Sequence, residues 1–157
     1  MKIKMLVMDV DGTLTDGKIY MGNRGELCKA FDVKDGCGIR MLLMPAGIRP
    51  IIITGRGSKI LKNRCKELGI TELYQNIADK AACLTKLLGN QPDFSQVAYI
   101  GDDINDLPCM ELVQAHGGLI GCPANAVDSV KEKADYVCAR NGGEGAVREF
   151  IEWLLAK

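Results

Sequence analysis

Three strand-sized runs of apolar residues constrain the fold of this 157-residue chain more than any other feature: 3–8 (IKMLVM), 49–53 (RPIII) and 97–101 (VAYIG). Runs that are apolar at nearly every position are typical of strands that are buried on both faces of a sheet. Segments with helical periodicity separate them, so strands alternate with helices along the chain. This alternation predicts an α/β fold, with a Rossmann-like, three-layer αβα arrangement around a mostly parallel sheet.

The segments between and after these runs predict the other elements. Residues 18–31 predict a β-hairpin, because a polar, glycine-flanked turn at 22–25 separates two arms that carry apolar side chains. Ser58 and Asp79 are favourable caps for helices that end at Gly69 and Gly89. Further helices are predicted after Asp35 and at 105–114, 126–133 and 144–156, with short strands at 70–75, 118–122 and 135–138. We expect residues 1–157 to form a single domain, with the hairpin at about 18–31 as a flap.

The bulk properties argue against several classes of protein. Basic and acidic residues balance at 20 each and no basic block stands out, so a nucleic-acid partner is not expected. The longest apolar runs, such as 51–53, are far shorter than the ~20 residues of a membrane span. The N-terminal run meets Asp9 too early for a secretory signal. We therefore expect a soluble, cytoplasmic protein that has no membrane partner.

The cysteines favour a reducing compartment. There are seven, an odd number, and no two of them form a C-x-x-C pair. We expect them to be reduced thiols that pack as small hydrophobic groups. With His116 as the single histidine, a structural zinc site is not expected.

Polar residues gather where the three apolar strands end. Asp9 and Asp11 follow the first strand, residues 54–56 (TGR) follow the second, and residues 101–103 (GDD) end the third. In parallel α/β sheets, ligands bind beyond the carboxyl ends of the strands. Neighbouring carboxylates repel one another unless a cation or a proton intervenes. With Asp102 and Asp106 added, the predicted site is rich in carboxylates and contains no histidine, which suits Mg²⁺.

Each of these pieces alone has a plainer explanation. The DVDGT segment could be a strand-to-turn junction, and GDDIND could be a helix start with capping carboxylates. Thr54 could cap its own turn, and Lys80 could be a solvated charge on a helix. The four pieces in this order on an α/β frame are much more specific than any one of them.

Taken together, DVDGTLTDG, TGR, Lys80 and GDDIND resemble the motifs of the haloacid dehalogenase superfamily of phosphohydrolases, and the resemblance covers the whole chain. The chain is most similar to the branch of small phosphatases acting on 3-deoxy-D-manno-octulosonate 8-phosphate (KDO 8-phosphate), in lipopolysaccharide sugar biosynthesis. The segments that carry this closer resemblance are LTDGKIYMGNRGE, AFDVKDGCGIRML, IITGRGSKILKNRCKELGI, YIGDDINDLPCME and GGEGAVRE.

The resemblance implies a role for each aspartate of the site. Asp9 would be the nucleophile that forms an aspartyl-phosphate. Asp11 would protonate the leaving sugar oxygen and then activate water. Mg²⁺ would be held by Asp9, Asp102 and the backbone carbonyl of Asp11. Asp103 and Asp106 would lie in the second shell of the metal or help to position Lys80.

The resemblance also implies how the substrate is held. Thr54 and Lys80 would bind the phosphate oxygens, so that they belong to the catalytic set together with Asp9 and Asp11. Arg56 and Arg64, with Lys59 in a lesser role, would bind the distant carboxylate of the sugar acid, either in their own chain or across a subunit boundary. For Arg64 and Lys59, a solvated helix face is nearly as good an explanation. The complete predicted substrate-binding set is Thr54, Gly55, Arg56, Lys59, Arg64 and Lys80.

The spacing of the motifs leaves no room for a lid. About 40 residues separate Asp11 from Thr54, and the hairpin and a helix use them. The resemblance implies a homotetramer in which a neighbouring subunit helps to close the site, and the apolar hairpin suits an interface. The alternative is that the hairpin folds back on its own domain.

Two other functions stay open. One is a phosphatase for the nine-carbon KDN or sialic acid 9-phosphate. In that related branch the position of Arg56 tends to be acidic, so Arg56 favours the eight-carbon substrate. The other is a catalytically idle, tetrameric scaffold that accompanies a sugar nucleotidyltransferase. The intact set of carboxylates argues against idleness, because a scaffold has no reason to keep such charges close together.

Overall fold

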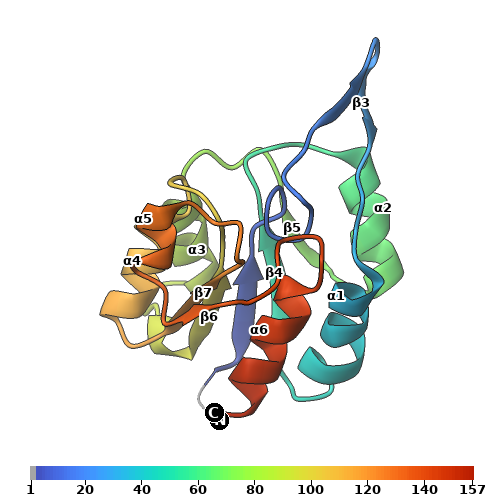
Figure 1. Ribbon diagram of the computed structural model, residues 1–157. Helices are drawn as coiled ribbons and strands as arrows, with labels where there is room; N and C mark the ends of the chain where they lie inside the picture. The colour runs from blue at the N-terminus through green and yellow to red at the C-terminus, as the bar shows by residue number, and fades with distance from the viewer. Residues whose placement is uncertain (1–2) are drawn as a thin grey trace.

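A six-stranded parallel sheet forms the centre of the molecule in a computed structural model that describes residues 3–157. The strand order is β5-β4-β1-β6-β7-β8, so the first strand lies in the middle of the sheet (Figure 1). The strands are β1 Met5–Met8, β4 Arg49–Ile53, β5 Glu72–Tyr74, β6 Val97–Ile100, β7 Leu119–Cys122 and β8 Tyr136–Val137. Because the chain order reverses at β1, the ends of β1 and β6 meet at the point where such sheets bind ligands.

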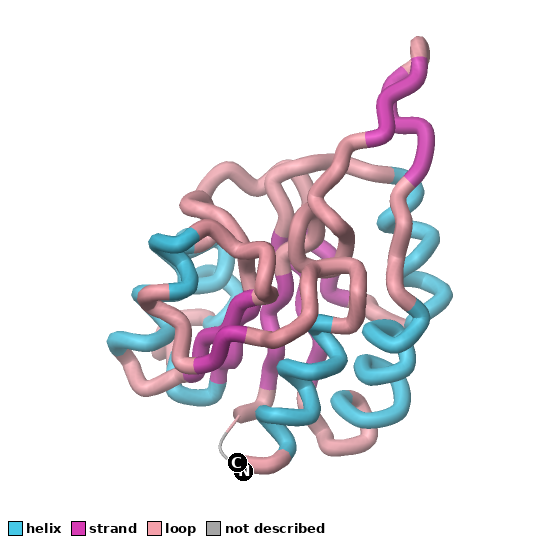
Figure 2. The backbone as a smooth tube through the Cα atoms, viewed as in Figure 1, coloured by secondary structure: helices cyan, strands magenta, loops and turns pink. Residues whose placement is uncertain are grey.

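Helices cover both faces of the sheet, as Figures 1 and 2 show. One layer contains α1 Val33–Gly38, its π-helical continuation Ile39–Leu43, α2 Lys59–Leu68 and α6 Ala146–Leu155; the other contains α3 Lys80–Leu88, α4 Leu107–Ala115 and α5 Asp128–Lys131. A short 3₁₀ turn, Phe94–Gln96, precedes β6. Along β1, Leu6 and Met8 pack into the first layer, and Met5 and Val7 pack into the second. The predicted three-layer α/β class is therefore confirmed.

Local caps explain where two of the helices begin and end. The Ser58 hydroxyl accepts a hydrogen bond from the Leu61 amide at 3.1 Å, and α2 ends at Gly69, whose φ of +76° is left-handed. Asp79 caps α3 in the same way, by accepting from the Ala82 amide at 2.9 Å.

The predicted start of the first helix was wrong. The helix begins at Val33, capped by Asp32, rather than after Asp35. Asp35 lies in the first turn of α1 and is buried, and its carboxylate accepts a hydrogen bond from the Arg148 amide of α6 at 2.8 Å. Its role is therefore a contact between two helices, which local sequence does not reveal.

The hairpin is formed by β2 Tyr20–Gly22 and β3 Gly25–Cys28, and it projects beyond the end of the sheet (Figures 1 and 2). Its apolar side chains are poorly covered, since Met21 is 60% exposed and Leu27 is 70% exposed. Between β1 and β4 the chain forms only this hairpin, α1 and the π-helical continuation, so no lid domain is inserted there.

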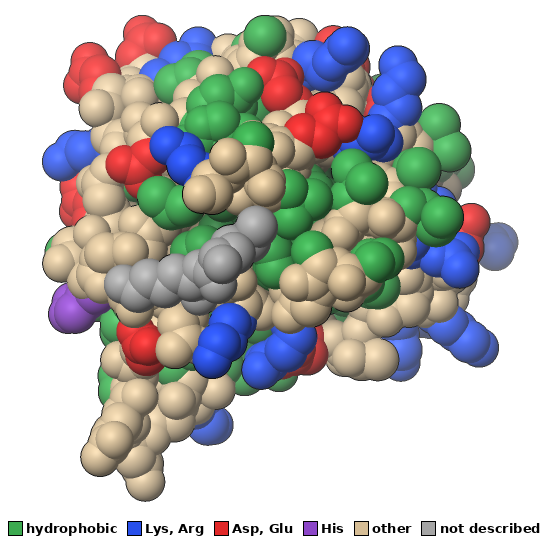
Figure 3. All heavy atoms as spheres, turned by 90° about the horizontal axis from the view of Figure 1, so that it is seen from below, with side chains coloured by type: hydrophobic (Ala, Val, Ile, Leu, Met, Phe, Trp, Pro, Cys, Tyr) green, Lys and Arg blue, Asp and Glu red, His purple; other side chains and the backbone are tan. Residues whose placement is uncertain are grey.

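The surface is of mixed charge at the end of the molecule where the chain termini lie. Basic and acidic side chains are interspersed there, without a large patch of one sign (Figure 3).

None of the helices within residues 3–157 has both the length and the apolar character that a membrane crossing requires. The expectation that the cysteines pack as small hydrophobic groups is confirmed for the four that are buried in the two apolar clusters: Cys65, Cys109, Cys122 and Cys138. Cys83 is partly buried against the second cluster. The expectation was wrong for Cys28 and Cys37, which are exposed, because Cys28 ends the projecting hairpin strand β3 and Cys37 lies on the outer face of α1.

Candidate active site

Asp9 occupies the carboxyl end of the central strand. Its backbone amide donates to the Ile100 carbonyl at 3.0 Å, so the ladder between β1 and β6 continues as far as this residue. The side chain is almost completely buried, and its Oδ1 accepts a hydrogen bond from the Lys80 Nζ at 2.6 Å. A buried carboxylate is therefore held at the tip of a rigid strand and paired with a buried lysine.

The loop after Asp9 turns tightly toward β6. The amides of residues 13, 14 and 15 all donate to the Val10 carbonyl, at 2.9 to 3.1 Å. Gly12 has a φ of +98°, and a Cβ there would overlap the Asp102 carboxylate. The Thr13 hydroxyl donates to Asp102 Oδ1 at 3.1 Å. The glycine of the DVDGT segment thus lets the loop approach the carboxylate at the end of β6.

Asp106 organises the floor of the site. Its fully buried carboxylate accepts from Lys80 Nζ at 2.7 Å and from the Tyr99 hydroxyl at 2.6 Å through Oδ1. Through Oδ2 it accepts from the backbone amides of Asp102 at 3.0 Å and Asp103 at 3.3 Å. Four donors therefore surround Asp106, and the predicted role in positioning Lys80 fits this geometry.

The electrostatics of the site reflect crowded carboxylates. Burial, and then the charge of Asp106, raise the pKa of Asp9 to about 6 although Lys80 opposes the change. Burial and the charges of Asp9 and Asp106 raise the pKa of Asp102 to about 8. Burial by itself would lower the pKa of Lys80, but the carboxylates of Asp9 and Asp106 raise it. One lysine does not neutralise three neighbouring carboxylates.

The donor set fits a divalent cation. One oxygen each from Asp9, Asp102 and Asp106 lies within 4.8 Å of the others. Because Asp106 already accepts four hydrogen bonds, Asp9 and Asp102 are the carboxylates with capacity left for a metal. Hard oxygen ligands and an excess of negative charge are what Mg²⁺ requires.

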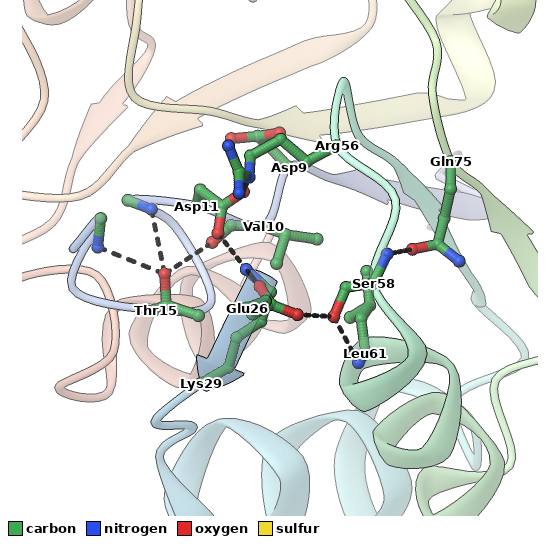
Figure 4. A network of polar contacts seen from close by, with 12 residues as sticks. Asp9, Val10, Asp11, Thr15, Glu26, Lys29, Arg56, Ser58, Leu61 and Gln75 are labelled. Atoms are coloured by element: carbon green, nitrogen blue, oxygen red, sulfur yellow. Dashed lines mark hydrogen bonds and ion pairs between the residues drawn. The ribbon is translucent and has the colours of Figure 1, made fainter. Parts of the chain in front are cut away.

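Asp11 lies beside this cluster and faces the root of the hairpin. Its Oδ1 accepts from Lys29 Nζ at 2.5 Å, and its Oδ2 lies 3.8 Å from Arg56 Nε (Figure 4). Burial by itself would lower the pKa of Lys29, but hydrogen bonds to Asp11 and Glu26 raise it. Two cations therefore lie beside the Asp11 carboxylate, at the root of the hairpin.

The segment after β4 lines the same edge of the sheet. Thr54 is buried, and its backbone is fixed by the Tyr74 carbonyl on one side and the Ile77 amide on the other. Gly55 and Arg56 follow and are exposed. The structure therefore brings Thr54 and Arg56 to the carboxyl ends of the central strands, as predicted.

Three of the predicted residues lie outside this cluster. Lys59 is the first residue of α2, and its side chain is exposed. Arg64 packs over the Phe31 ring, at 5.8 Å from the ring centre, so its position does not support contact with a substrate bound to its own chain. Asp103 is exposed and accepts from the Ile104 amide at 2.7 Å, rather than reaching Lys80.

Sequence reasoning missed three residues of the site. Lys29 lies among the apolar residues of the hairpin segment, Tyr99 belongs to an apolar strand, and Thr13 belongs to the DVDGT segment. Tyr99 carried a usable signal, because a tyrosine in a strand buried on both faces needs a partner for its hydroxyl. Lys29 carried little signal, since its partners are remote in sequence.

This fold and site define a class of protein: an enzyme of Rossmann-like α/β architecture, with aspartates at the ends of its central strands for metal-assisted chemistry. The family model for haloacid dehalogenase-like hydrolases matches residues 59–151. A 3-deoxy-D-manno-octulosonate 8-phosphate phosphatase, KdsC, from Yersinia pestis is 48% identical over 156 residues, which cover 98% of this chain and 80% of that protein.

Solved structures agree over the whole chain. The crystal structure of the phosphatase from Yersinia pestis has a TM-score of 0.89 at 47% identity and covers 99% of this chain and 82% of that one. The phosphatase from Moraxella catarrhalis, in complex with a magnesium ion, a phosphate ion and KDO, has a TM-score of 0.88 at 40% identity. That match covers 99% of this chain and 87% of that one. The chain belongs to the haloacid dehalogenase-like hydrolases and, within them, to the KDO 8-phosphate phosphatase (KdsC) family.

Proposed function

We propose that this protein is a Mg²⁺-dependent phosphomonoesterase that hydrolyses KDO 8-phosphate to KDO and phosphate in lipopolysaccharide sugar biosynthesis. The observation that carries the proposal is the buried Asp9 carboxylate, held by Lys80 beside Asp102 at the end of the central strand. The similarity of the whole chain to KDO 8-phosphate phosphatases supports the choice of substrate.

Asp9 and Asp11 divide the chemistry between them. In the first step, a carboxylate oxygen of Asp9 forms a bond to phosphorus while the bond from phosphorus to the sugar oxygen breaks. Asp11 gives its proton to that leaving oxygen. In the second step, Asp11 takes a proton from water, the water oxygen bonds to phosphorus, and Asp9 is released from its phosphate. Asp11 lies two residues after Asp9, beyond the same strand.

Charge neutralisation is the other requirement, because an anion attacks a phosphate dianion. Mg²⁺ held by Asp9, Asp102 and the Asp11 backbone carbonyl would supply positive charge to the phosphate oxygens. Lys80 fixes Asp9 and adds a compact cation, and Thr54 offers a hydroxyl to a phosphate oxygen. Asp106 keeps Lys80 in place.

Arg56 is our candidate for recognising the sugar acid. Its side chain is 48% exposed and lies near Asp11, where the sugar would leave the phosphate. A guanidinium group pairs well with a carboxylate. Arg56 lies two residues after Thr54, in the exposed segment that follows β4. Lys59 and Arg64 belong in the substrate-binding set only if they serve the site of a neighbouring subunit.

We also propose that the protein is cytoplasmic, that residues 1–157 form one domain, and that the protein is a homotetramer. A single sheet covered on both faces supports the one-domain proposal. The exposed apolar side chains of the hairpin support assembly through this element.

The test is phosphate release from KDO 8-phosphate, KDN 9-phosphate and other sugar phosphates, each with Mg²⁺ or with EDTA. We expect selective release from KDO 8-phosphate that needs Mg²⁺ and that Asp9→Asn abolishes. Faster release from KDN 9-phosphate would overturn the role of Arg56 and leave the mechanism in place. If no phosphate ester is hydrolysed, the idle scaffold becomes the better explanation.

A further inference from the structure

Lys29 is a buried cation that the catalytic scheme above does not use. It follows β3, at the point where the hairpin returns to the body of the molecule, and its side chain is only 3% exposed. Its Nζ lies 2.5 Å from Asp11 Oδ1 and 2.9 Å from Glu26 Oε1. A buried lysine is costly unless it is paired, so this geometry needs both carboxylates.

Glu26 is itself held from the other side. Its second oxygen, Oε2, accepts a hydrogen bond from the Ser58 hydroxyl. The same hydroxyl accepts from the Leu61 amide, and the Ser58 amide donates to Gln75 Oε1 at 2.7 Å (Figure 4). A continuous row of polar contacts therefore leads from the first turn of α2, through Glu26 and Lys29, to the Asp11 carboxylate.

The other cation near Asp11 is held less tightly. Arg56 Nε lies 3.8 Å from Asp11 Oδ2, and about half of the arginine side chain is exposed. Lys29 is closer and buried, and it is anchored by a second carboxylate. Among the described contacts of the Asp11 carboxylate, the one with Lys29 is the one that can fix its orientation.

We propose that Lys29 is a positioning residue: its ammonium group, anchored by Glu26 and Ser58, holds the Asp11 carboxylate where it exchanges a proton with the leaving oxygen. The inference rests on the proposed function, because it assumes that Asp11 is the acid and base of the reaction. The inference also means that the hairpin contributes residues to the active site of its own chain, in addition to any contact with a neighbouring subunit.

A purely structural role for Lys29 would impair every substrate alike, whereas a role through Asp11 depends on the leaving group. Nitrophenolate leaves p-nitrophenyl phosphate without a proton, but a sugar alkoxide needs one. We expect Lys29→Met to lower kcat for KDO 8-phosphate about 10²-fold, with KM changed less than about threefold. For p-nitrophenyl phosphate we expect a loss of less than about tenfold. Lys29→Arg, which keeps the charge, should recover most of the activity.

A double-mutant cycle tests whether the effect passes through Asp11. Adding Lys29→Met to Asp11→Asn should cause no further loss of kcat, because no acid remains to be positioned. Lys62→Met, at an exposed position of α2, is the matched control and should behave as the wild type. If Lys29→Met does not fold, as judged by circular dichroism, Lys29→Gln takes its place in every comparison.

Three results would overturn the proposal. The first two are equal losses of kcat on both substrates, and a full further loss in the Asp11→Asn background. A crystal structure of the Lys29 variant gives a readout independent of turnover, and an unmoved Asp11 carboxylate would also overturn the proposal.

Failure of the proposed function is a separate result. If the wild type cleaves another sugar phosphate instead of KDO 8-phosphate, the comparison is made on that ester. If the wild type cleaves no phosphate ester, the crystal structure of the Lys29 variant is the remaining test. An unmoved Asp11 carboxylate then overturns the proposal, and a displaced one supports it.

Discussion

Asp106 is the most enclosed carboxylate of the site, yet its four hydrogen bonds leave it little capacity for a metal. Lys80 and the Tyr99 hydroxyl approach one of its oxygens, and two backbone amides approach the other. Asp102 accepts only from Thr13 among the described side chains and faces Asp9. The two aspartates lie close together but should have different tasks.

We predict that Asp106→Asn and Asp102→Asn separate catalysis from metal binding. Asp106→Asn should lower kcat by about 10²-fold, because Lys80 loses a charged partner, while Mg²⁺ affinity falls less than about tenfold. Asp102→Asn should weaken Mg²⁺ binding much more, by loss of a ligand. Isothermal titration with Mg²⁺, together with phosphate release, measures both. Equal weakening of Mg²⁺ binding would mean that Asp106 is a ligand as well.

At the level of the elements, α6 depends on a cap that comes from another helix. Gly145 precedes α6 and has no side chain to offer. Asp35, in α1, accepts from the Arg148 amide instead, and burial raises the pKa of Asp35 to about 6 from its ordinary 3.8. Its Oδ2 is buried and has no hydrogen-bond partner. The site of Asp35 therefore favours the protonated form.

This raised pKa predicts a stability that falls as the pH rises. Between pH 4 and 6 the folded protein binds more protons at Asp35 than the unfolded chain does, so the free energy of unfolding decreases through this window. A pKa raised from 3.8 to about 6 lowers the free energy of unfolding by about 3 kcal/mol at most across this window. Asp35→Asn keeps the acceptor for the Arg148 amide and should remove this part of the slope. Urea unfolding of both proteins at pH 4, 5, 6 and 7 in EDTA measures it. Parallel curves would contradict the prediction.

The same elements show how far sequence reasoning reaches. Ser58 and Gly69 bound α2 as predicted, because caps act on amides and carbonyls within a few residues. The strand ends brought Asp9 and Asp102 together as predicted, since parallel topology alone places them at one edge. Asp35 and Lys29 were not predicted, because their partners are remote in sequence and only the packed structure shows them.

At the scale of the whole molecule, the hairpin is the part that a single chain leaves uncovered. Met21 and Leu27 are more than half exposed, and a two-stranded ribbon is marginally stable alone. A neighbouring subunit that packed on the hairpin would bury these apolar side chains and would also stabilise the two-stranded ribbon. The site itself, at the carboxyl edge of the sheet, lies below this hairpin (Figure 1).

We predict that Leu27→Asp breaks the proposed tetramer. Light scattering coupled to size exclusion should give the wild type a mass four times that of the 17.1 kDa chain and give Leu27→Asp a smaller mass. Met41→Asp is a suitable control, because Met41 is 66% exposed but lies outside the hairpin. A monomeric wild type, or an intact Leu27→Asp tetramer, would refute assembly through the hairpin.

The division between buried and exposed parts of the site also bears on how such enzymes diverge. Asp9, Lys80 and Asp106, which would act on the phosphate or hold the groups that do, are buried. Asp9 follows β1, Lys80 begins α3 and Asp106 precedes α4, so the packed core around them tolerates little change. Arg56, by contrast, lies on an exposed loop, and the hairpin is exposed as well. Substitutions in these outer parts can alter which ester is accepted without disturbing the reacting groups. A lineage built on this frame can therefore acquire new substrates while its chemistry stays fixed.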